Sequence, residues 1–456
     1  MREFRSVARA RSGAQRGVGP GCRDQSVPAT EDLARMLRRA GLGVLFGTVM
    51  VDMMGFGIVL PLLPFYAEEM GASPRWVTLI IASFSITQLL SAPIWGRFSD
   101  RVGRRRLLLI GLFASALSYL LFALADNLWV LLLSRATAGA AGGTVGIAQA
   151  YVADSTEGEE RAKGLGLIGA ASGLGIMLGP AIGGAFSSFG LGVPGYVAAG
   201  LCLLNLMAAM VLLPESRHFR SGRADASKGE AATVRLWLRS LNRFPLRVLL
   251  LVYFLTLACF TSMTSVLALY AERVFAMTAA DMGLVFTLAG GCTVIVRGGL
   301  VGRIVKRFGE PRTMRAGCAL LALGVGAIPF IEEGWQLWLL VPTWASATGL
   351  IFPALHALIS RATDEHSQGS VFGGSQVAGG AGRVLAPLAA GHLFELYAIE
   401  SPFLVGAAAS AVALWLALRI PAARDPKAKE ELDPTDRWTG PVAAHEPRDQ
   451  PDARSP

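Results

Sequence analysis

The sequence predicts an all-α integral membrane protein with twelve transmembrane helices, arranged as two six-helix, pseudo-symmetric bundles. Three observations lead to this fold class. The 456 residues are 53% hydrophobic and only 16% charged, and the mean hydropathy is +0.48, which is too apolar for a polar shell to keep in water. About twelve apolar stretches are long enough to cross a bilayer. Finally, motifs of the first half recur in the second.

Crossing a hydrocarbon core of roughly 30 Å takes about twenty mostly apolar residues, because every backbone N–H and C=O must be satisfied inside the helix. The stretches that meet this requirement are 42–66, 76–97, 107–124, 127–150, 164–186, 193–213, 247–271, 279–303, 313–331, 334–357, 370–394 and 399–420. They divide the chain into a basic N-terminal tail at 1–41, a first bundle at 42–213, a polar linker at 214–246, a second bundle at 247–420 and a tail at 421–456. The last tail is rich in proline and charge, and we expect it to be disordered.

An internal repeat supports two halves. The segment Gly96–Arg106 is echoed by Gly302–Arg312. At nearly the same offset, a second set is echoed: Gly166, Gly173, Gly175, Pro180 and Gly184 by Gly373, Gly380, Gly382, Pro387 and Gly391. Chance similarity between apolar segments does not give two matching offsets. The repeat therefore predicts two bundles related by an axis along the membrane normal, with a cavity at the midplane between them.

The net charge of +9 is spread over short loops. The basic loops are Arg97–Arg106, Arg217–Arg247 and Arg303–Arg315, and the loops between them carry Glu68, Glu69, Asp126, Glu332 and Glu333. The positive-inside rule then predicts a multi-pass protein of the inner (plasma) membrane with both termini in the cytoplasm. Because the basic residues follow the topology, we expect the lipid bilayer and no nucleic acid as a partner. We expect a monomer.

The loop after the second span reads G-x-x-x-D-R-x-G-R-R. Its members are Gly96, Asp100, Arg101, Gly103, Arg104 and Arg105. We expect Gly96 and Gly103 to allow a tight helix-to-loop turn, Asp100 to cap or pair across the interface, and the arginines to hold the loop at the anionic leaflet. A purely topogenic basic loop is the alternative.

The first span carries D-x-x-G-x-G-x-x-x-P-x-x-P. These positions are Asp52, Gly55, Gly57, Pro61 and Pro64. A carboxylate inside a span costs about 3 kcal/mol, so Asp52 needs a cavity or a partner. We expect Asp52 to carry a proton; a structural hydrogen-bonding acid is the alternative.

Two further motifs lie in the fourth and fifth spans. Arg135, followed by Gly139, places a guanidinium in an apolar stretch, where it must find polar groups or snorkel to the outer interface. The fifth span reads G-x8-G-x3-G-P-x2-G-G. Its members are Gly166, Gly175, Gly179, Pro180, Gly183 and Gly184. We expect a kink at Pro180 and close backbone approach along the glycines, with undirected close packing as the alternative.

Together these four motifs resemble those of the major facilitator superfamily, and within it the twelve-helix drug:proton antiporters of the tetracycline-exporter type. The resemblance covers residues 42–420. It implies that the Gly96–Arg106 loop latches the halves in the outward-facing state, that Arg135 takes part in proton transfer, and that the fifth-span motif belongs to antiporters.

The resemblance predicts a secondary active transporter, not an enzyme, that exports small amphipathic, drug-like molecules in exchange for protons by alternating access. Asp52 and Arg135 are the proton-coupling candidates, and the proton gradient takes the place of a cofactor. A proton-coupled or facilitative uptake transporter for a metabolite is the alternative in the same fold. No metal is expected.

The chain departs from the tetracycline exporters in its second half. There the spans lack acidic residues near their centres, and Arg297 and Arg383 are the ionisable groups instead. A basic half-cavity suits an anionic or zwitterionic substrate better than a cationic one, so tetracycline itself is not expected. The candidates for the substrate cavity are Gln88, Gln149, Asn205, Phe260, Arg297, Trp344, Gln376 and Arg383.

Overall fold

The computed structural model describes residues 28–156, 158–213, 244–363 and 368–420. Most of the linker predicted at 214–246 and the whole tail predicted at 421–456 lie outside these residues. In the first half the helices are α1 (Pro28–Val59), α2 (Leu63–Glu69), α3 (Pro74–Val102), α4 (Arg104–Ala123), α5 (Leu128–Ala141), α6 (Thr144–Ser155), α7 (Gly158–Ser187) and α8 (Val193–Leu212). In the second half they are α10 (Leu246–Phe275), α11 (Ala279–Ile295), the π-helix η2 (Val296–Leu300), α12 (Val301–Phe308), α13 (Glu310–Gly326), the 3-10 turn η3 (Ile328–Phe330), α14 (Gly334–Arg361), α15 (Gln368–Leu396) and α16 (Ser401–Leu418).

Within these ranges all regular structure is helical, and eleven helical segments are long and apolar enough to cross a membrane. The first begins at Leu42, where the sequence places the first span, although α1 itself extends back to Pro28. The twelfth segment is α15. It has the length of a span, but its glycines and polar residues, among them Gln376 and Arg383, make it less apolar than the other eleven.

Two predicted spans are interrupted helices. The span 42–66 breaks after Val59 and resumes at Leu63, because Pro61 has no N–H to continue the helical ladder. The span 127–150 breaks between α5 and α6 at Gly142 and Gly143. Reading these stretches as single helices was therefore wrong in detail, since length and apolarity alone do not reveal a break inside a span.

A single glycine joins the second and third spans in each half. Gly103, with φ +99°, separates α3 from α4, and Gly309, with φ +79°, separates α12 from α13. Positive φ is open to glycine at little cost. Gly96, in contrast, lies inside α3, with no atom within 4 Å of the place of a Cβ. The expectation that Gly96 forms part of the turn was wrong: the helix continues to Val102.

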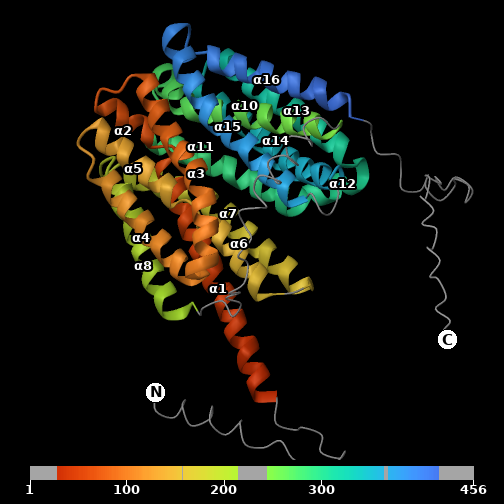
Figure 1. Ribbon diagram of the computed structural model, residues 1–456. Helices are drawn as coiled ribbons and strands as arrows, with labels where there is room; N and C mark the ends of the chain where they lie inside the picture. Colours follow the sequence, from red (N-terminus) through yellow and green to blue (C-terminus); the bar gives the residue numbers. More distant parts are fainter. Residues whose placement is uncertain (1–27, 157, 214–243, 364–367, 421–456) are drawn as a thin grey trace, which may run out of the picture.

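The helices form two bundles, α1–α8 and α10–α16 (Figure 1). The most extensive contacts between them are α7 with α11 and α3 with α15, and α10 also meets α2 and α3. The first pair is in backbone contact: a Cβ added to Gly283 would lie 2.7 Å from the Cα of Gly184, and one added to Gly290 would lie 2.7 Å from the Cα of Met177. Glycine is required at both positions because a larger side chain would push the bundles apart.

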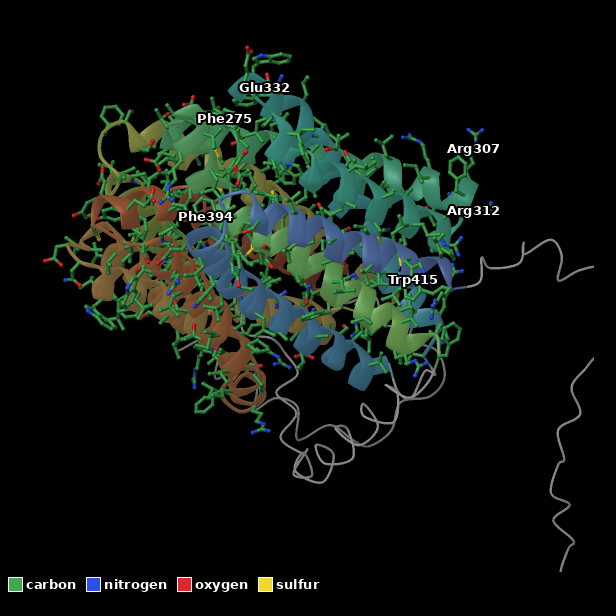
Figure 2. The ribbon with its side chains drawn as sticks, turned by 90° about the horizontal axis from the view of Figure 1, so that it is seen from above. Phe275, Arg307, Arg312, Glu332, Phe394 and Trp415 are labelled. Carbon is green, nitrogen blue, oxygen red and sulfur yellow. The ribbon has the colours of Figure 1, made fainter. Side chains whose placement is uncertain are left out.

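The two ends of the molecule differ in charge and in closure. We call the end that carries Glu68, Asp126 and Glu332 the acidic end and the end that carries Arg97–Arg106 and Arg303–Arg315 the basic end. Figure 2 shows Glu332 and Phe275 far from Arg307 and Arg312 in the second bundle.

Ion pairs join the bundles at the acidic end. Arg273 lies 2.7 Å from Glu68, and Arg75 lies 3.4 Å from Glu395. The contact between α7 and α11 continues from Gly184 only as far as Gly173 and Val294, where an added Cβ would be at 3.4 Å. Towards the basic end, a Cβ on Gly166, Gly169, Gly298 or Gly373 would meet nothing within 4 Å. The bundles are therefore closed at the acidic end and separated at the basic end.

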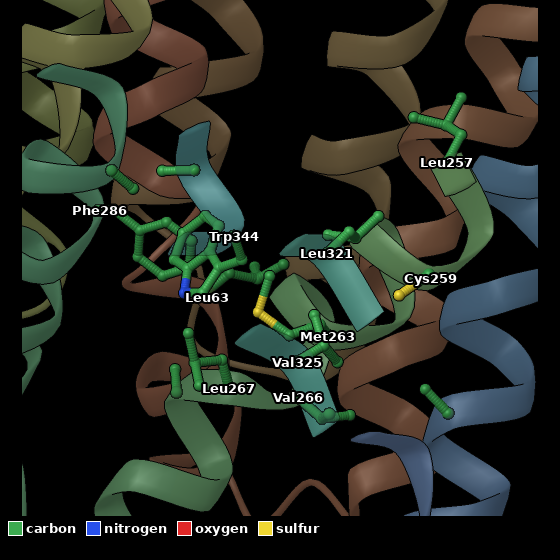
Figure 3. Packing of buried hydrophobic residues seen from close by; sticks show 14 of the residues in the cluster. Leu63, Leu257, Cys259, Met263, Val266, Leu267, Phe286, Leu321, Val325 and Trp344 are labelled. Atoms are coloured by element: carbon green, nitrogen blue, oxygen red, sulfur yellow. The ribbon is translucent and has the colours of Figure 1, made fainter. Parts of the chain in front are cut away.

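The second bundle has its own apolar core. Trp344, Met263 and Leu321 come from α14, α10 and α13, and each is at most 2% exposed. Figure 3 shows these side chains in the core. Gly324 lets α13 approach α14 at Trp344, since a Cβ on Gly324 would lie 3.0 Å from the backbone nitrogen of Trp344. This core is a rigid scaffold for the groups that face the other bundle.

Candidate functional site

Asp52 lies in the interior of the first bundle. Its side chain comes from α1 and is 7% exposed. The hydroxyl of Ser115 on α4 donates a hydrogen bond of 3.2 Å to Asp52 Oδ1, and the hydroxyl of Thr144 on α6 faces the same carboxyl group. No ion pair among the described residues involves Asp52. The protonated, neutral form of a carboxyl group suits this buried position. The deprotonated form has only uncharged hydrogen-bond donors to stabilise its charge.

Tyr119 lies between Asp52 and Arg135. It is one turn from Ser115 on α4, is 4% exposed, and lies within electrostatic range of both charged groups. Its ring packs on the backbone of α1 at Gly55, where an added Cβ would lie 2.6 Å from Cε2. The glycine of the first-span motif therefore makes room for the ring, one turn from Asp52.

The guanidinium of Arg135 is buried against aromatic faces. Arg135 is 4% exposed, and its Cζ lies 5.7 Å from the centre of the Tyr119 ring and 5.1 Å from that of Phe122. Its Nη2 is buried without a hydrogen-bond partner among the described residues. The burial contradicts snorkelling to the outer interface. One donor of this cation remains available inside the bundle.

The glycines of the fifth-span motif lie in α7 and pack on α1 beside this cluster. A Cβ on Gly179 would lie 2.5 Å from the carbonyl oxygen of Met54 and 2.7 Å from the Cα of Gly57, and one on Gly183 would lie 2.5 Å from the carbonyl oxygen of Ile58. Gly184 faces the other way, toward α11. Thus α7 lies between the two bundles, in backbone contact with both.

The second bundle contains a pocket of about 300 Å³. It is lined by Tyr253, Leu257, Arg297, Phe352, Pro353 and His356. Arg297 extends from the π-helix η2 and lies 5.9 Å from the centre of the Phe352 ring. Arg383 on α15 is within electrostatic range of Tyr253, as is Arg297. The structure thus gathers the two second-half arginines around one tyrosine.

Comparison with known proteins agrees with this architecture. The family model described as Major Facilitator Superfamily matches residues 45–373 and 335–447. The chain belongs to the Major Facilitator Superfamily. It is 32% identical to the class C tetracycline resistance protein of Escherichia coli over 333 residues, covering 72% of this chain and 83% of the relative.

Further similarities extend over more of the transporter. It is 28% identical to multidrug resistance protein 2 of Bacillus subtilis (strain 168), covering 82% of this chain and 94% of that protein. The crystal structure of the human organic anion transporter MFSD10 (TETRAN) is 25% identical, with a TM-score of 0.62, over 83% of this chain and 99% of that one. A mutant of the nucleoside transporter NupG is 14% identical with a TM-score of 0.72, over 83% and 98%, and shows the same fold.

In the transporter, the other cavity candidates are spread over several environments. Asn205 on α8 is 9% exposed and accepts a 3.3 Å hydrogen bond from the Thr48 hydroxyl, so it joins α8 to α1. Gln88 donates to the Gly142 carbonyl over 3.3 Å, at the break between α5 and α6. Gln149 and Gln376 are exposed. Trp344, at 2% exposed, packs in the core against Phe260 with ring centres 6.1 Å apart; it does not line the pocket.

Two described arginines of the G-x-x-x-D-R-x-G-R-R segment contact the first bundle. Arg104 forms an ion pair of 2.9 Å with Asp154 on α6 and donates to the Ser99 hydroxyl. Arg105 donates to the Met210 carbonyl on α8. The side chains of Asp100 and Arg101 lie outside the described residues.

Sequence reasoning missed Ser115, Tyr119 and Tyr253 as members of the two sites. The transporter has only 7 tyrosines, and a phenol inside an apolar span needs a polar neighbour. That signal was present for Tyr119 and Tyr253. It was weaker than a charge, because an aromatic residue at helical spacing is usually part of the packing.

Proposed function

We propose that the transporter exports small amphipathic molecules in exchange for protons by alternating access. The observation that carries the proposal is the state of Asp52. Asp52 and Glu310 are the two acidic side chains under 9% exposed among the described residues. Glu310 forms an ion pair with Arg361, whereas Asp52 accepts a hydrogen bond from the hydroxyl of Ser115. A buried carboxyl without a counter-charge changes its interactions most when it gains or loses a proton.

In this proposal Asp52 is the proton carrier and Arg135 its electrostatic partner through Tyr119. When Asp52 is deprotonated, its charge is attracted to the unpaired guanidinium donor of Arg135, and Tyr119 is the group between them. When Asp52 is protonated, that attraction is lost. Protonated and deprotonated Asp52 therefore favour different positions of α1 relative to α4 and α5. Such a difference in interaction energy between two conformations is what coupling requires.

The basic end is assigned to the cytoplasm by the positive-inside rule. The structure then corresponds to an inward-open state, with the external side closed by Glu68–Arg273 and Arg75–Glu395. Both termini lie in the cytoplasm, and the protein is a monomer of the inner (plasma) membrane. Substrate enters from the cytoplasm or the inner leaflet. The Gly96–Arg106 segment latches the bundles when the basic end closes.

The substrate assignment draws support from the relatives. Two of them are resistance proteins, one for tetracycline and one for multiple drugs, and one solved relative is an organic anion transporter. These molecules share a small size and a mixed polar and apolar surface. An export role is in keeping with the resistance proteins, and α7 carries the glycine pattern that antiporters share.

The test is proton movement in inverted membrane vesicles with an acidified lumen. Addition of a panel of drugs of different charge is expected to make the lumen less acidic for a subset of them. Asp52→Asn is expected to abolish this response, because the amide cannot carry a proton. Asp126→Asn, the same change at an exposed acidic-end loop, is the matched control and is expected to retain it.

Two outcomes would count against the proposal. Full proton-driven export by Asp52→Asn would remove Asp52 as the coupling acid. Inward accumulation of a metabolite driven by an inward proton gradient, with no drug response, would favour the uptake alternative in the same fold.

A further inference from the structure

The pocket of the second bundle carries positive charge without an internal counter-charge. No ion pair among the described residues involves Arg297 or Arg383. The described acidic residues of this bundle lie at helix ends: Glu272, Asp281, Glu310, Glu332, Glu333, Glu395 and Glu400. Arg297 lines this pocket, and Arg383 lies within electrostatic range of Tyr253 beside it, so the pocket carries positive charge that no described carboxylate offsets.

The backbone holds Arg297 in this position for a local reason. Residues Val296–Leu300 form a π-helix between α11 and α12, and such a turn inserts one extra residue and rotates the following side chains; these turns are frequent at functional sites. Gly298 and Gly299 follow Arg297 and leave open space beside it. The arginine can therefore reach a ligand in the cavity without displacing a neighbouring side chain.

The remaining lining suits a flat aromatic group. Tyr253 meets Phe352 and His356 edge to face, with ring centres 5.9 and 5.6 Å apart, and His356 is stacked on Phe372 at 6.3 Å. The volume of about 300 Å³ is at the lower end of the range for pockets that hold drug-sized molecules. The pocket therefore combines aromatic surfaces with the guanidinium of Arg297, which lies over the Phe352 ring.

We propose that this pocket binds an organic anion, with Arg297 and Arg383 holding a carboxylate or sulfonate and Tyr253, Phe352 and His356 packing against its aromatic ring. Arginine matches these groups because its planar fork donates two parallel hydrogen bonds. The inference rests on the proposed transport function and specifies its substrate class.

The experiment measures equilibrium binding to the full-length protein, purified in a non-ionic detergent with no proton gradient. Three matched probes share one ring system and differ in charge: naphthalene sulfonate, naphthylmethanol and naphthylmethylammonium. In the wild type, the sulfonate is expected to bind about tenfold or more tightly than the ammonium, the effect of at least one charge-assisted hydrogen bond.

Substitutions at Arg297 separate charge recognition from packing. Arg297→Gln is expected to weaken sulfonate binding by about tenfold and to leave naphthylmethanol binding unchanged, and Arg297→Lys to retain part of the preference. Arg297→Glu is expected to reverse the preference toward the ammonium. Arg307→Gln, on the exposed end of α12, is the matched control. Retained naphthylmethanol binding shows that each variant is folded.

Equal binding of sulfonate and ammonium by the wild type would overturn the proposal, as would an equal loss of all three probes in Arg297→Gln. Because no gradient is present, this result is independent of proton exchange. Charge-selective binding together with no proton movement in vesicles would overturn the proposed function alone. Proton exchange with cations only would overturn the anion assignment alone.

Discussion

Gly283→Ala is expected to open the acidic end of the molecule. The new Cβ would lie 2.7 Å from the Cα of Gly184 and 2.7 Å from the carbonyl oxygen of Pro180, whereas carbon atoms pack at about 3.5–4.0 Å. Both neighbours are backbone atoms, so no rotamer change relieves the overlap, and α7 and α11 must separate by about 1 Å. Overpacking of this kind costs about 1–3 kcal/mol.

The cost falls on the state that is closed at the acidic end, because α11 and α7 touch at Gly283 in that state. The ratio of molecules closed at the acidic end to molecules open there is therefore expected to fall by about 5- to 150-fold. Gly298→Ala, farther along the same span toward the basic end, is the matched control, since an added Cβ there meets nothing within 4 Å.

The assay is a distance measurement between spin labels at Asp126→Cys and Glu332→Cys, which lie at the acidic ends of opposite bundles, in a background without the native cysteines. A longer-distance population is expected to grow in Gly283→Ala and not in Gly298→Ala. Identical distance distributions in the two glycine variants would refute the conclusion that this backbone contact closes the acidic end.

Three further outcomes are expected. Exchange of one internal anion for one external proton moves two positive charges inward per cycle, worth about 4.6 kcal/mol per 100 mV. Uptake of an anionic substrate into proteoliposomes, in exchange for internal protons, is therefore expected to accelerate with an inside-positive potassium diffusion potential. Indifference to the potential would contradict an anionic substrate. Glu68→Gln and Arg273→Gln are each expected to shift the equilibrium between the closed and the open acidic end by about 0.2–1 kcal/mol toward opening, as read from the spin-label populations. The double variant is expected to shift it by less than the sum of the two; additive shifts would show that the pair does not act together. Gly103→Ala is expected to cost about 1–3 kcal/mol in thermal unfolding, because φ is +99° there, whereas Gly96→Ala is expected to cost little; equal effects would disprove the difference in backbone demand.

The spans and the two-bundle fold could be predicted because a bilayer imposes a length and an apolarity on each helix. The breaks could not. Pro61 interrupts one predicted span and Gly142 another, whereas Pro180 lies within a continuous helix. Proline and glycine occur in both situations, and the packing of neighbouring helices decides whether the backbone groups that they release find partners.

The candidate site was predictable where it consists of charge. Asp52, Arg135, Arg297 and Arg383 stand out from apolar surroundings, and the structure places all four within its two polar regions. Tyr119 was not identified because its role depends on a contact across helices α1, α4 and α5, which no periodicity within one helix records. The set of residues that face one cavity also depends on the conformation of the transporter, and the sequence does not record the conformation.

The two sites lie on opposite bundles, and α7 is in backbone contact with helices of both. Gly179 and Gly183 hold it against α1 beside Asp52, and Gly184 holds it against α11, whose Gly290 is about 10 Å of helix before Arg297. Contacts between glycines present no side chain that must repack, so the helices can roll or slide at small cost. Under the proposed mechanism, a change at Asp52 that moves α1 is carried into the bundle interface, where the position of α11 sets how far the proposed anion pocket opens at the basic end. In such a design, proton and substrate need no common ligand, because each biases the same interface.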